Sequence, residues 1–278
     1  MKLNAAEIIG VDEQAFALAP DPRSLRIAPH RLVLAALAAL LVAAVAVFGR
    51  WDWLPTYLPQ ILSGIMVSMV LLVASGAIGF LFAIPIGLAQ VKGGFIAATL
   101  ARWFCIVIRG TPLLLQLWLL YYGLGSLFPG IPWIRTSFLW PYLRQAWPYA
   151  LLSLTISFAA YEGEVMRGAF AGVPRGEIEA ARAVGMSPWL LFRRIWLPLA
   201  IYRSLPTLLG ETVLQLKSTP LVATITVLDV FAVIGRVRQD TYIIYEPLLL
   251  LSAIYCGLTA LLVLAFRFFE SRIVASRG

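Results

Sequence analysis

Polar side chains within a strongly apolar segment are the residues of this sequence best placed to contact a small solute. Four of them recur at helical spacing: Thr207, Glu211, Gln215 and Ser218. A helix over about 205–227 would carry all four on one face, whereas Lys217, six residues from Glu211, lies too far along to share that face. A carboxylate near mid-span costs about 2.5–3.5 kcal/mol on insertion scales and therefore usually belongs to a transport pathway. We predict that Glu211 attracts a cationic group of a solute; the alternative is that hydrogen bonds hold it for packing alone.

Three further polar positions are candidates for the same environment. Glu164 lies three residues before Arg167, so it contributes either to the pathway or to a local ion pair. Gln116 lies in an apolar segment, where an amide commonly joins helices by hydrogen bonds, and it is a pathway candidate as well. Glu162 has no local partner, and its alternative environment is cytoplasmic water.

The sequence offers no set of residues for catalysis or for holding a metal ion. Cys105 and Cys256 lie in separate apolar runs, and the single histidine, His30, lies in the N-terminal segment. The Walker A pattern G-x-x-x-x-G-K-[ST] does not occur, so we expect no ATP hydrolysis by this chain. A membrane-embedded enzyme is disfavoured, because it would need a convergent nucleophile, base or metal set.

The composition places the chain in a membrane. Of its 278 residues 61% are hydrophobic and 13% are charged, and the mean hydropathy is +0.87. Soluble domains are about 45–50% apolar and about a quarter charged. The net charge of +8 is more typical of cytoplasmic loops between membrane spans than of a nucleic-acid partner, and we expect none.

Long apolar runs predict an all-α fold with about six membrane-spanning helices. A helix at 95–110, which contains Arg102 and Arg109, is expected to enter obliquely from the cytoplasmic side and to continue into the third span. Pro220 is expected to break or bend the fifth span. Residues 229–246 are interpreted as a connection. The six spans are expected at about 31–48, 62–90, 111–125, 148–170, 205–227 and 247–266.

Basic residues indicate the orientation of these spans. Most lysines and arginines lie in segments that would share one side with both termini. Because basic residues concentrate in short cytoplasmic loops, both termini and the loop at 171–200 are predicted to lie inside. Six of the 22 lysines and arginines lie in the outer segments or upper span ends: Arg50, Arg135, Arg144, Lys217, Arg236 and Arg238.

The segment 177–200 predicts two short helices separated by a glycine. Glu177 to Val184 contains strong helix formers, with acidic residues in the first turn, where the helix dipole favours them. Gly185 can adopt the left-handed conformation that ends such a helix. Ser187 can cap a second helix that begins at Pro188 and runs to about Trp196, and Pro198 is expected to limit its continuation.

This spacing resembles the EAA loop of the membrane subunits of bacterial ABC importers. The family pattern is Glu-Ala-Ala, three residues, Gly, nine residues, Ile, one residue, Leu-Pro. The chain matches it at Glu179, Ala180, Ala181, Gly185, Ile195, Leu197 and Pro198. In that family the loop docks as a coupling helix on the ATP-hydrolysing subunit, and the resemblance extends this role to Met186 and Ser187. The alternative is an ordinary cytoplasmic helical hairpin.

Three other stretches resemble the polar amino acid branch of these permeases. One is Arg109-Gly110-Thr111-Pro112 with Gln116 and Tyr121-Tyr122-Gly123, and another is Ala160-Tyr161 through Val173-Pro174-Arg175-Gly176. The third is Leu205-Pro206 through Leu216-Lys217-Ser218-Thr219. The run VPRGEIEAARAVG, with Asp229 further on, is similar to the histidine/basic amino acid and octopine/nopaline permease subunits. Together these stretches cover about residues 60–270.

The resemblance implies a type I ABC importer transmembrane domain at 58–270, with a coupling loop at 171–200. Residues 1–30 are expected to form a cytoplasmic tail, 31–50 an additional membrane helix and 271–278 a second cytoplasmic tail. The implied partners are a second permease subunit, identical or a sister chain, two ATP-binding subunits and an external solute-binding protein. The implied role is import of a polar, basic amino acid or an opine across the bacterial inner membrane. The chain would itself bind no cofactor, since ATP and Mg²⁺ belong to the partner ATPase. The alternative class is an ion-coupled secondary transporter with Glu211 as its coupling residue.

Cysteine labelling in intact cells tests this orientation. In a background without Cys105 and Cys256, a cysteine at Ser187 is expected to resist membrane-impermeant thiol reagents, whereas one within 126–147 is expected to react. Labelling after cell disruption controls for accessibility, because both positions should then react. The opposite pattern in intact cells would overturn the predicted orientation.

Overall fold

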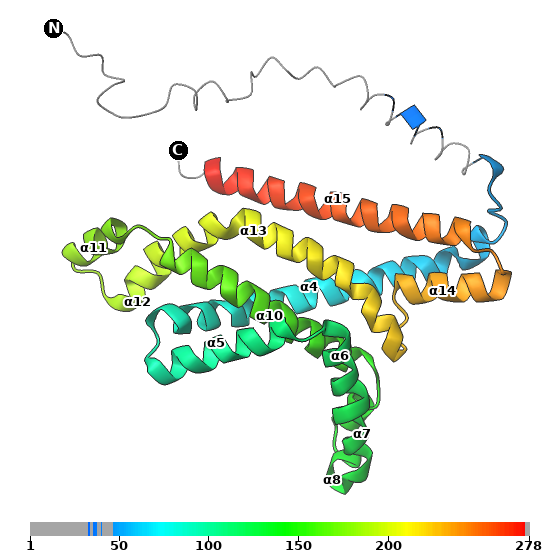
Figure 1. Cartoon of the computed structure of the whole chain (residues 1–278), viewed down its shortest axis with the longest axis horizontal. Coiled ribbons are helices and arrows are strands. Elements are labelled where there is room, and N and C mark those ends of the chain that lie inside the picture. The colour runs from blue at the N-terminus through cyan, green and yellow to red at the C-terminus, as the bar shows by residue number, and fades with distance from the viewer. Residues whose placement is uncertain (1–32, 34–35, 38–39, 41–46, 276–278) are drawn as a thin grey trace. The chain divides into compact units, whose positions relative to one another are not determined.

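The computed structural model describes residues 33, 36–37, 40 and 47–275, with side chains described as far as residue 268. The chain divides into two units, Met1–Arg50 and Trp51–Gly278. The predicted tail at 1–30 lies outside the described residues, as does most of the additional helix at 31–50. Every regular element of the described part is a helix, as predicted (Figure 1). The five longest helices are α4 (Leu54–Lys92), α5 (Phe95–Gly110), α10 (Trp147–Ala171), α13 (Leu197–Ser218) and α15 (Tyr245–Ala275).

Helix α10 is the central helix of the second unit. More than half of it, 14 of 25 residues, is buried, and it packs against α4, α5 and α13. Many of its buried residues are small, including Ala150, Ser153 and Ala160. Small side chains let helix backbones approach closely, which is how helices associate in an apolar solvent.

Glycines make the contact between α4 and α10 close. A Cβ atom on Gly87 would lie 2.7 Å from Cβ of Met166 and 2.8 Å from the backbone nitrogen of Arg167. On Gly79 it would lie 3.1 Å from the carbonyl oxygen of Thr155. Gly163 of α10 is similarly close to Ile86 of α4, at 2.7 Å from Cγ2. A side chain at any of these positions would therefore require neighbouring atoms to shift.

The chain breaks between α5 and the segment that follows it. Thr111 and Pro112 are extended, and the chain then continues as helical turns through Gly130. These turns are α6 (Leu113–Trp118), a π-helical turn (Leu119–Leu124), α7 (Gly125–Leu127) and a 3₁₀ turn (Phe128–Gly130). Two short helices, α8 (Pro132–Arg135) and α9 (Trp140–Leu143), lead to α10. Figure 1 shows α6, α7 and α8 running across the direction of α10.

Helix α13 begins earlier than predicted. The short helices α11 (Arg175–Ala183) and α12 (Pro188–Leu191) are followed by a π-helical turn, Phe192–Trp196, and then directly by α13. Pro198 was expected to limit this helix, but it lies in the first turn of α13, where its missing N–H group costs little. The expectation that Pro198 limits the helix, together with a start near residue 205, was therefore wrong.

The end of α13 contains the predicted break. The helix stops at Ser218 and continues as a 3₁₀ helix, Thr219–Ile225, with Pro220 in its first turn. The segment 229–246, predicted to connect the fifth and sixth spans, contains α14 (Val230–Thr241). Asp229 caps it by accepting a hydrogen bond from the Ala232 N–H group, at 2.9 Å. The buried residues of α14 recur at helical spacing: Val230, Val233, Ile234 and Val237.

By length and composition, the described residues contain three helices able to cross a membrane: Leu54–Lys92, Leu113–Gly130 and Tyr245–Phe268. A fourth crossing is possible if Pro188–Ile225 and Val230–Thr241, which meet at a 53° bend, form one broken span. Helix α10 covers the predicted fourth span but is not among them, because residues such as Ser153, Glu162 and Glu164 lower its hydropathy. The count of six therefore stays a prediction.

The glycine contact predicts a stability difference between two matched substitutions. Gly87→Ala is expected to lower the free energy of unfolding by about 1–3 kcal/mol, because the added methyl group forces α4 and α10 apart. Gly257→Ala in α15 is the control, since a Cβ there meets nothing within 4 Å. Thermal unfolding in detergent should show a lower transition temperature for Gly87→Ala only. Equal transition temperatures would contradict the packing described for α4 and α10.

Candidate functional site

A cavity of about 310 Å³ lies between α6, α10 and α13. We call it the Glu211 cavity. Its lining combines apolar and polar side chains, and the polar members include one carboxylate and one ammonium group. The lining residues are Leu113, Ser157, Phe158, Tyr161, Glu211, Leu214, Gln215, Lys217 and Ser218.

The predicted polar stripe of α13 contributes three of its four members to this cavity. Glu211, Gln215 and Ser218 line it, whereas Thr207 is exposed and lies outside the lining. Buried Gln215 donates hydrogen bonds from Nε2 to Ser75 Oγ at 3.1 Å and to the Leu154 carbonyl oxygen at 3.0 Å. Gln215 therefore joins α13 to α4 and α10, and Glu211 is the acidic member of the stripe that lines the cavity.

Lys217 also lines the Glu211 cavity, although its spacing from Glu211 had placed it on another face. Two residues of α13 that do not share a face therefore both border this cavity. A negative and a positive side chain thus lie on one cavity wall. The sequence indicated neither Lys217 nor Tyr161 and Ser157 of α10 as members of this site.

A second cavity, of about 500 Å³, lies between α4, α5 and α10. We call it the basic pocket, because three arginines line it. Glu164, predicted either to line the pathway or to pair locally with Arg167, does pair with it, with 2.9 Å between Arg167 Nε and Glu164 Oε2. Arg109 Nη1 lies 3.9 Å from the same oxygen. The residues around the basic pocket are Gln90, Val91, Arg102, Cys105, Ile106, Arg109, Glu164, Arg167 and Ala171.

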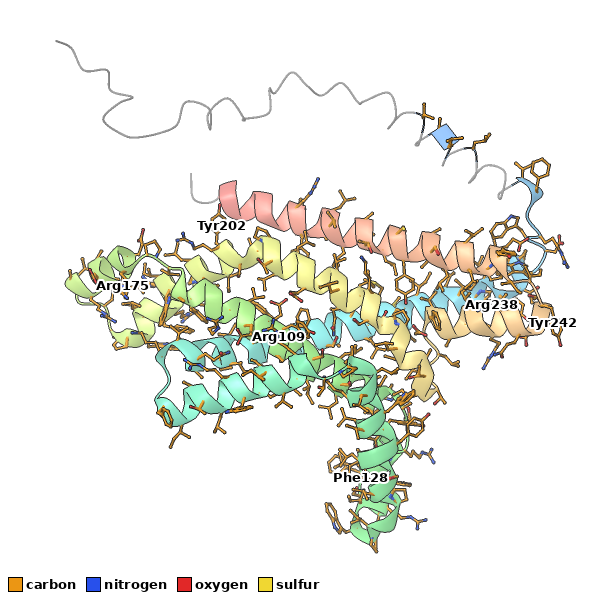
Figure 2. The ribbon with its side chains drawn as sticks, viewed as in Figure 1. Arg109, Phe128, Arg175, Tyr202, Arg238 and Tyr242 are labelled. Atoms are coloured by element: carbon orange, nitrogen blue, oxygen red, sulfur yellow. The ribbon has the colours of Figure 1, made fainter. Side chains whose placement is uncertain are left out.

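Arg109 and Tyr161 connect the two cavities. The Arg109 guanidinium lies 5.3 Å from the centre of the Tyr161 ring, a cation–π contact. Tyr161 lines the Glu211 cavity and Arg109 lines the basic pocket. Figure 2 shows Arg109 near the end of α5, where α5 lies beside α10.

Gln116 has its amide nitrogen engaged away from both cavities. Its Nε2 donates to the Ile108 carbonyl oxygen at 2.7 Å, to the Thr111 carbonyl oxygen at 3.1 Å and to Thr111 Oγ1 at 2.9 Å. These hydrogen bonds satisfy backbone groups that the break at Pro112 leaves open. Gln116 therefore stabilises the junction of α5 and α6. It lines neither cavity, its Oε1 has no hydrogen-bond partner among the described residues, and its pathway role stays a prediction.

Glu162 is completely buried, which contradicts the alternative that it faces cytoplasmic water. Neither of its carboxyl oxygens has a hydrogen-bond partner among the described residues. It borders an apolar cavity of about 360 Å³ between α4, α10, α13 and α15. Packing rather than sequence decided its environment, because α13 covers this face of α10.

The glycine turn between α11 and α12 has the predicted backbone conformation. Gly185 has φ +78°, in the left-handed region. The Met186 N–H group donates to the Ala181 carbonyl oxygen at 3.2 Å, and the Gly185 N–H group donates to the Arg182 carbonyl oxygen at 2.9 Å. This pair of hydrogen bonds is the Schellman pattern of helix ends. Ser187 caps α12 by accepting from the Leu190 N–H group at 3.4 Å.

We call Arg175–Trp196 the Gly185 hairpin, and one side of it is anchored to the core. Ala181, Leu191 and Trp196 are buried, and Trp196 Nε1 donates to the Phe170 carbonyl oxygen of α10 at 3.0 Å. The other side is open: Glu179 and Ala180 are exposed, and so are the apolar side chains of Val184 and Trp189. An exposed apolar tip on an anchored hairpin is suited to contact another protein.

Among the described residues, no three histidine, cysteine or acidic side chains lie close enough together to hold a metal ion. The arrangement provides charged cavities and an exposed hairpin, which are features for binding and moving a solute.

Comparison with known proteins gives relatives over most of the chain. The family model described as "Binding-protein-dependent transport system inner membrane component" matches residues 77–275. The octopine transport system permease protein OccM of Rhizobium meliloti is 43% identical over 195 residues, which are 70% of this chain and 78% of that protein. The nopaline transport system permease protein NocM of Agrobacterium fabrum (strain C58) is 38% identical, over 72% of this chain and 82% of that protein. The histidine/lysine/arginine/ornithine transport system permease protein HisM of Escherichia coli (strain K12) is 32% identical, over 76% of this chain and 87% of that protein.

Solved structures agree with these relatives. A crystal structure of an amino acid ABC transporter with histidines matches with a TM-score of 0.65 and 30% identity, covering 78% of this chain and 95% of that chain. An inward-facing MetNI methionine ABC transporter matches with a TM-score of 0.56 and 20% identity, covering 80% of this chain and 97% of that chain. At this identity the match supports the fold alone.

Proposed function

Because the chain belongs to the family of binding-protein-dependent transport system inner membrane components, we propose that it carries a polar, basic amino acid or an opine across the inner membrane. It is a permease subunit of an ABC amino acid or opine importer. In the proposed complex it lies in the bacterial inner membrane, with both termini in the cytoplasm. A second permease subunit, two ATP-binding subunits and an external solute-binding protein complete the importer.

The Glu211 cavity is the observation that carries the proposal for the solute. A zwitterionic amino acid presents a carboxylate and at least one cationic group. The cavity presents the opposite charges, with Glu211 for the side-chain cation of a basic amino acid and Lys217 for the α-carboxylate. Tyr161, Ser157 and Ser218 add hydroxyl groups for further hydrogen bonds. Charge-assisted hydrogen bonds of this kind are about twice as strong as neutral ones.

The Gly185 hairpin is proposed to couple this cavity to the ATPase. Its exposed tip offers Val184 and Trp189 on either side of Gly185, with Glu179 and Ala180 beside them. Its anchored side reaches α10 through the Trp196–Phe170 hydrogen bond. A movement of an ATPase subunit against the tip would then act on the helix that lines both cavities.

An ion-coupled secondary transporter is the second candidate function. It would use Glu211 as an ion-coupling residue and would need no ATPase. Membership of a family whose members work with a binding protein favours the importer. ATP-dependent uptake by the reconstituted complex is the experiment that separates the two. Uptake driven by an ion gradient without ATP would contradict the importer.

Removing the charge of Glu211 should affect the uptake of cationic and neutral amino acids differently. Glu211→Gln is expected to lower uptake of a cationic amino acid by about tenfold, equivalent to about 1.4 kcal/mol, and uptake of a neutral amino acid by much less. Lys217→Gln is the comparison, because every amino acid has an α-carboxylate and both solutes should lose uptake. Membrane expression and basal ATPase activity are the controls. An equal loss of both solutes in Glu211→Gln would make Glu211 a packing or gating residue.

Substitution of Gly185 should impair the coupling of transport to ATP hydrolysis without preventing assembly of the complex. Gly185→Val forces a β-branched residue to φ near +78°, which costs about 1–3 kcal/mol and displaces the exposed tip. Transport and solute-stimulated ATPase activity are expected to fall together, while the complex still assembles in the membrane.

Gly185→Asn is the matched control for that substitution, since asparagine tolerates the left-handed region and should retain most of the activity. Normal transport by Gly185→Val would refute the coupling role.

A further inference from the structure

The cavity beside Glu162 has walls that are apolar almost throughout. We call it the Glu162 cavity, and side chains of α4, α10, α13 and α15 line it. Its volume of about 360 Å³ lies within the range of about 300–1,000 Å³ that is typical of small-molecule sites. In the lining that the structure describes, Glu162 and Thr212 are the polar side chains, and no lysine or arginine accompanies them.

Glu162 borders this cavity with a carboxyl group that the protein does not satisfy. The side chain is completely buried, and neither oxygen has a hydrogen-bond partner among the described residues. An ionised carboxylate without a partner is costly in an apolar environment. Protonation removes the charge, but it leaves the O–H donor and the other oxygen without partners. Both protonation states of Glu162 therefore lack partners in the described part of the chain.

The electrostatic neighbour of Glu162 is another acid. Its carboxyl group interacts with that of Glu211, which lies on α13. The arginines closest to it in sequence on its own face of the bundle do not compensate it, because Arg167 and Arg109 pair with Glu164 instead. The surroundings of Glu162 thus favour the arrival of a positive charge.

Water is poorly suited to satisfy Glu162. A buried water molecule typically makes about three hydrogen bonds. Apart from Glu162, the polar side chain of the described lining is Thr212, whose hydroxyl group already donates to the Leu208 carbonyl oxygen at 2.7 Å. A ligand with an apolar body fits the remaining walls better, because it makes dispersion contacts with them that a single water molecule does not.

The Glu162 cavity reaches the surface of the bundle at α4. Val73 lines the cavity and is 61% exposed. Gly76 lines it one turn further on, and a Cβ atom there would lie 4.0 Å from Phe158 Cε1 and otherwise in open space. Helix α4 is one of the described helices able to cross a membrane. A ligand dissolved in the bilayer can therefore enter beside Val73.

We propose that the Glu162 cavity binds an amphiphilic amine, a ligand with a compact apolar body and one ammonium group. The ammonium group brings a positive charge and N–H donors for both oxygens of Glu162, and such charge-assisted hydrogen bonds are about twice as strong as neutral ones. A lipid headgroup is a poorer source of the ammonium group, because Glu162 lies about 14 Å along the axis from the nearer end of α10, at Ala171. The amine is a ligand distinct from the solute assigned to the Glu211 cavity.

Binding of 1-aminoadamantane to the full-length chain in phosphatidylcholine nanodiscs tests this proposal. The probe joins an apolar cage to one ammonium group, and 1-adamantanol, which carries a hydroxyl group instead, is the comparison. Empty nanodiscs correct for partition into lipid. Glu162→Gln keeps the shape of the side chain but removes its charge. The Kd of the amine is therefore expected to rise by about tenfold, and the Kd of the alcohol by much less.

Two glycine substitutions locate the site. Gly76→Leu puts a side chain into the cavity and leaves Glu162 in place, so it should weaken binding of both probes. Gly257→Leu is the matched control, since Gly257 lies outside the lining and a Cβ there meets nothing within 4 Å. Thermal unfolding shows whether each variant is folded. If Glu162→Gln does not fold, the glycine pair decides, and equal binding by its two members overturns the proposal.

Three further results would overturn the proposal. The first is that the amine binds the wild type no more tightly than the alcohol does. The second is a loss of amine binding in Glu211→Gln that equals or exceeds the loss in Glu162→Gln, which would assign the amine to the Glu211 cavity. The third is displacement of the probe by phosphatidylethanolamine in the nanodisc, which would assign the ammonium group to a lipid headgroup. A loss that is largest in Glu162→Gln and Gly76→Leu supports the proposal.

Discussion

The close approach of α4 and α10 is the contact on which the rest of the structure depends. In a bilayer, apolar side chains gain little by leaving lipid for protein, so helices associate through tight packing. Gly79 and Gly87 of α4 and Gly163 of α10 permit that packing, because a side chain at any of these positions would require neighbouring atoms to shift. The contact buries one side of α10. Helices α5, α6 and α13 also pack against α10, and together with α4 they enclose the two charged cavities.

Polar groups inside this bundle differ in how completely the protein satisfies them. The amide nitrogen of Gln215 joins three helices, and that of Gln116 closes the break after α5. The carbonyl oxygens of Gln116 and Gln90 are buried and have no hydrogen-bond partner among the described residues. A buried acceptor without a donor costs free energy in an apolar environment, so each of these oxygens is a place where water or a ligand can supply a hydrogen bond.

The proposed mechanism depends on α10 belonging to both the cavities and the anchoring of the Gly185 hairpin. Ser157, Tyr161 and Glu164 of this helix line the cavities, and its Phe170 carbonyl oxygen accepts the hydrogen bond from Trp196. Packed helices move as rigid elements. A displacement of the hairpin by an ATPase subunit would therefore change the width of the cavities, which is how ATP hydrolysis could be linked to solute movement in the proposed importer.

The sequence by itself determined the helical class, the position of most long helices and the turn at Gly185. These features follow from local rules: apolar runs, proline and glycine positions, and helix caps. It also identified Glu211, because a carboxylate in an apolar segment is conspicuous. Only the tertiary structure decided which polar residues share a cavity. Lys217, Tyr161 and Arg102 join a site through contacts between helices distant in sequence, and Glu162 is buried because α13 covers it. Helical spacing gives the face of one helix, whereas packing decides what that face meets.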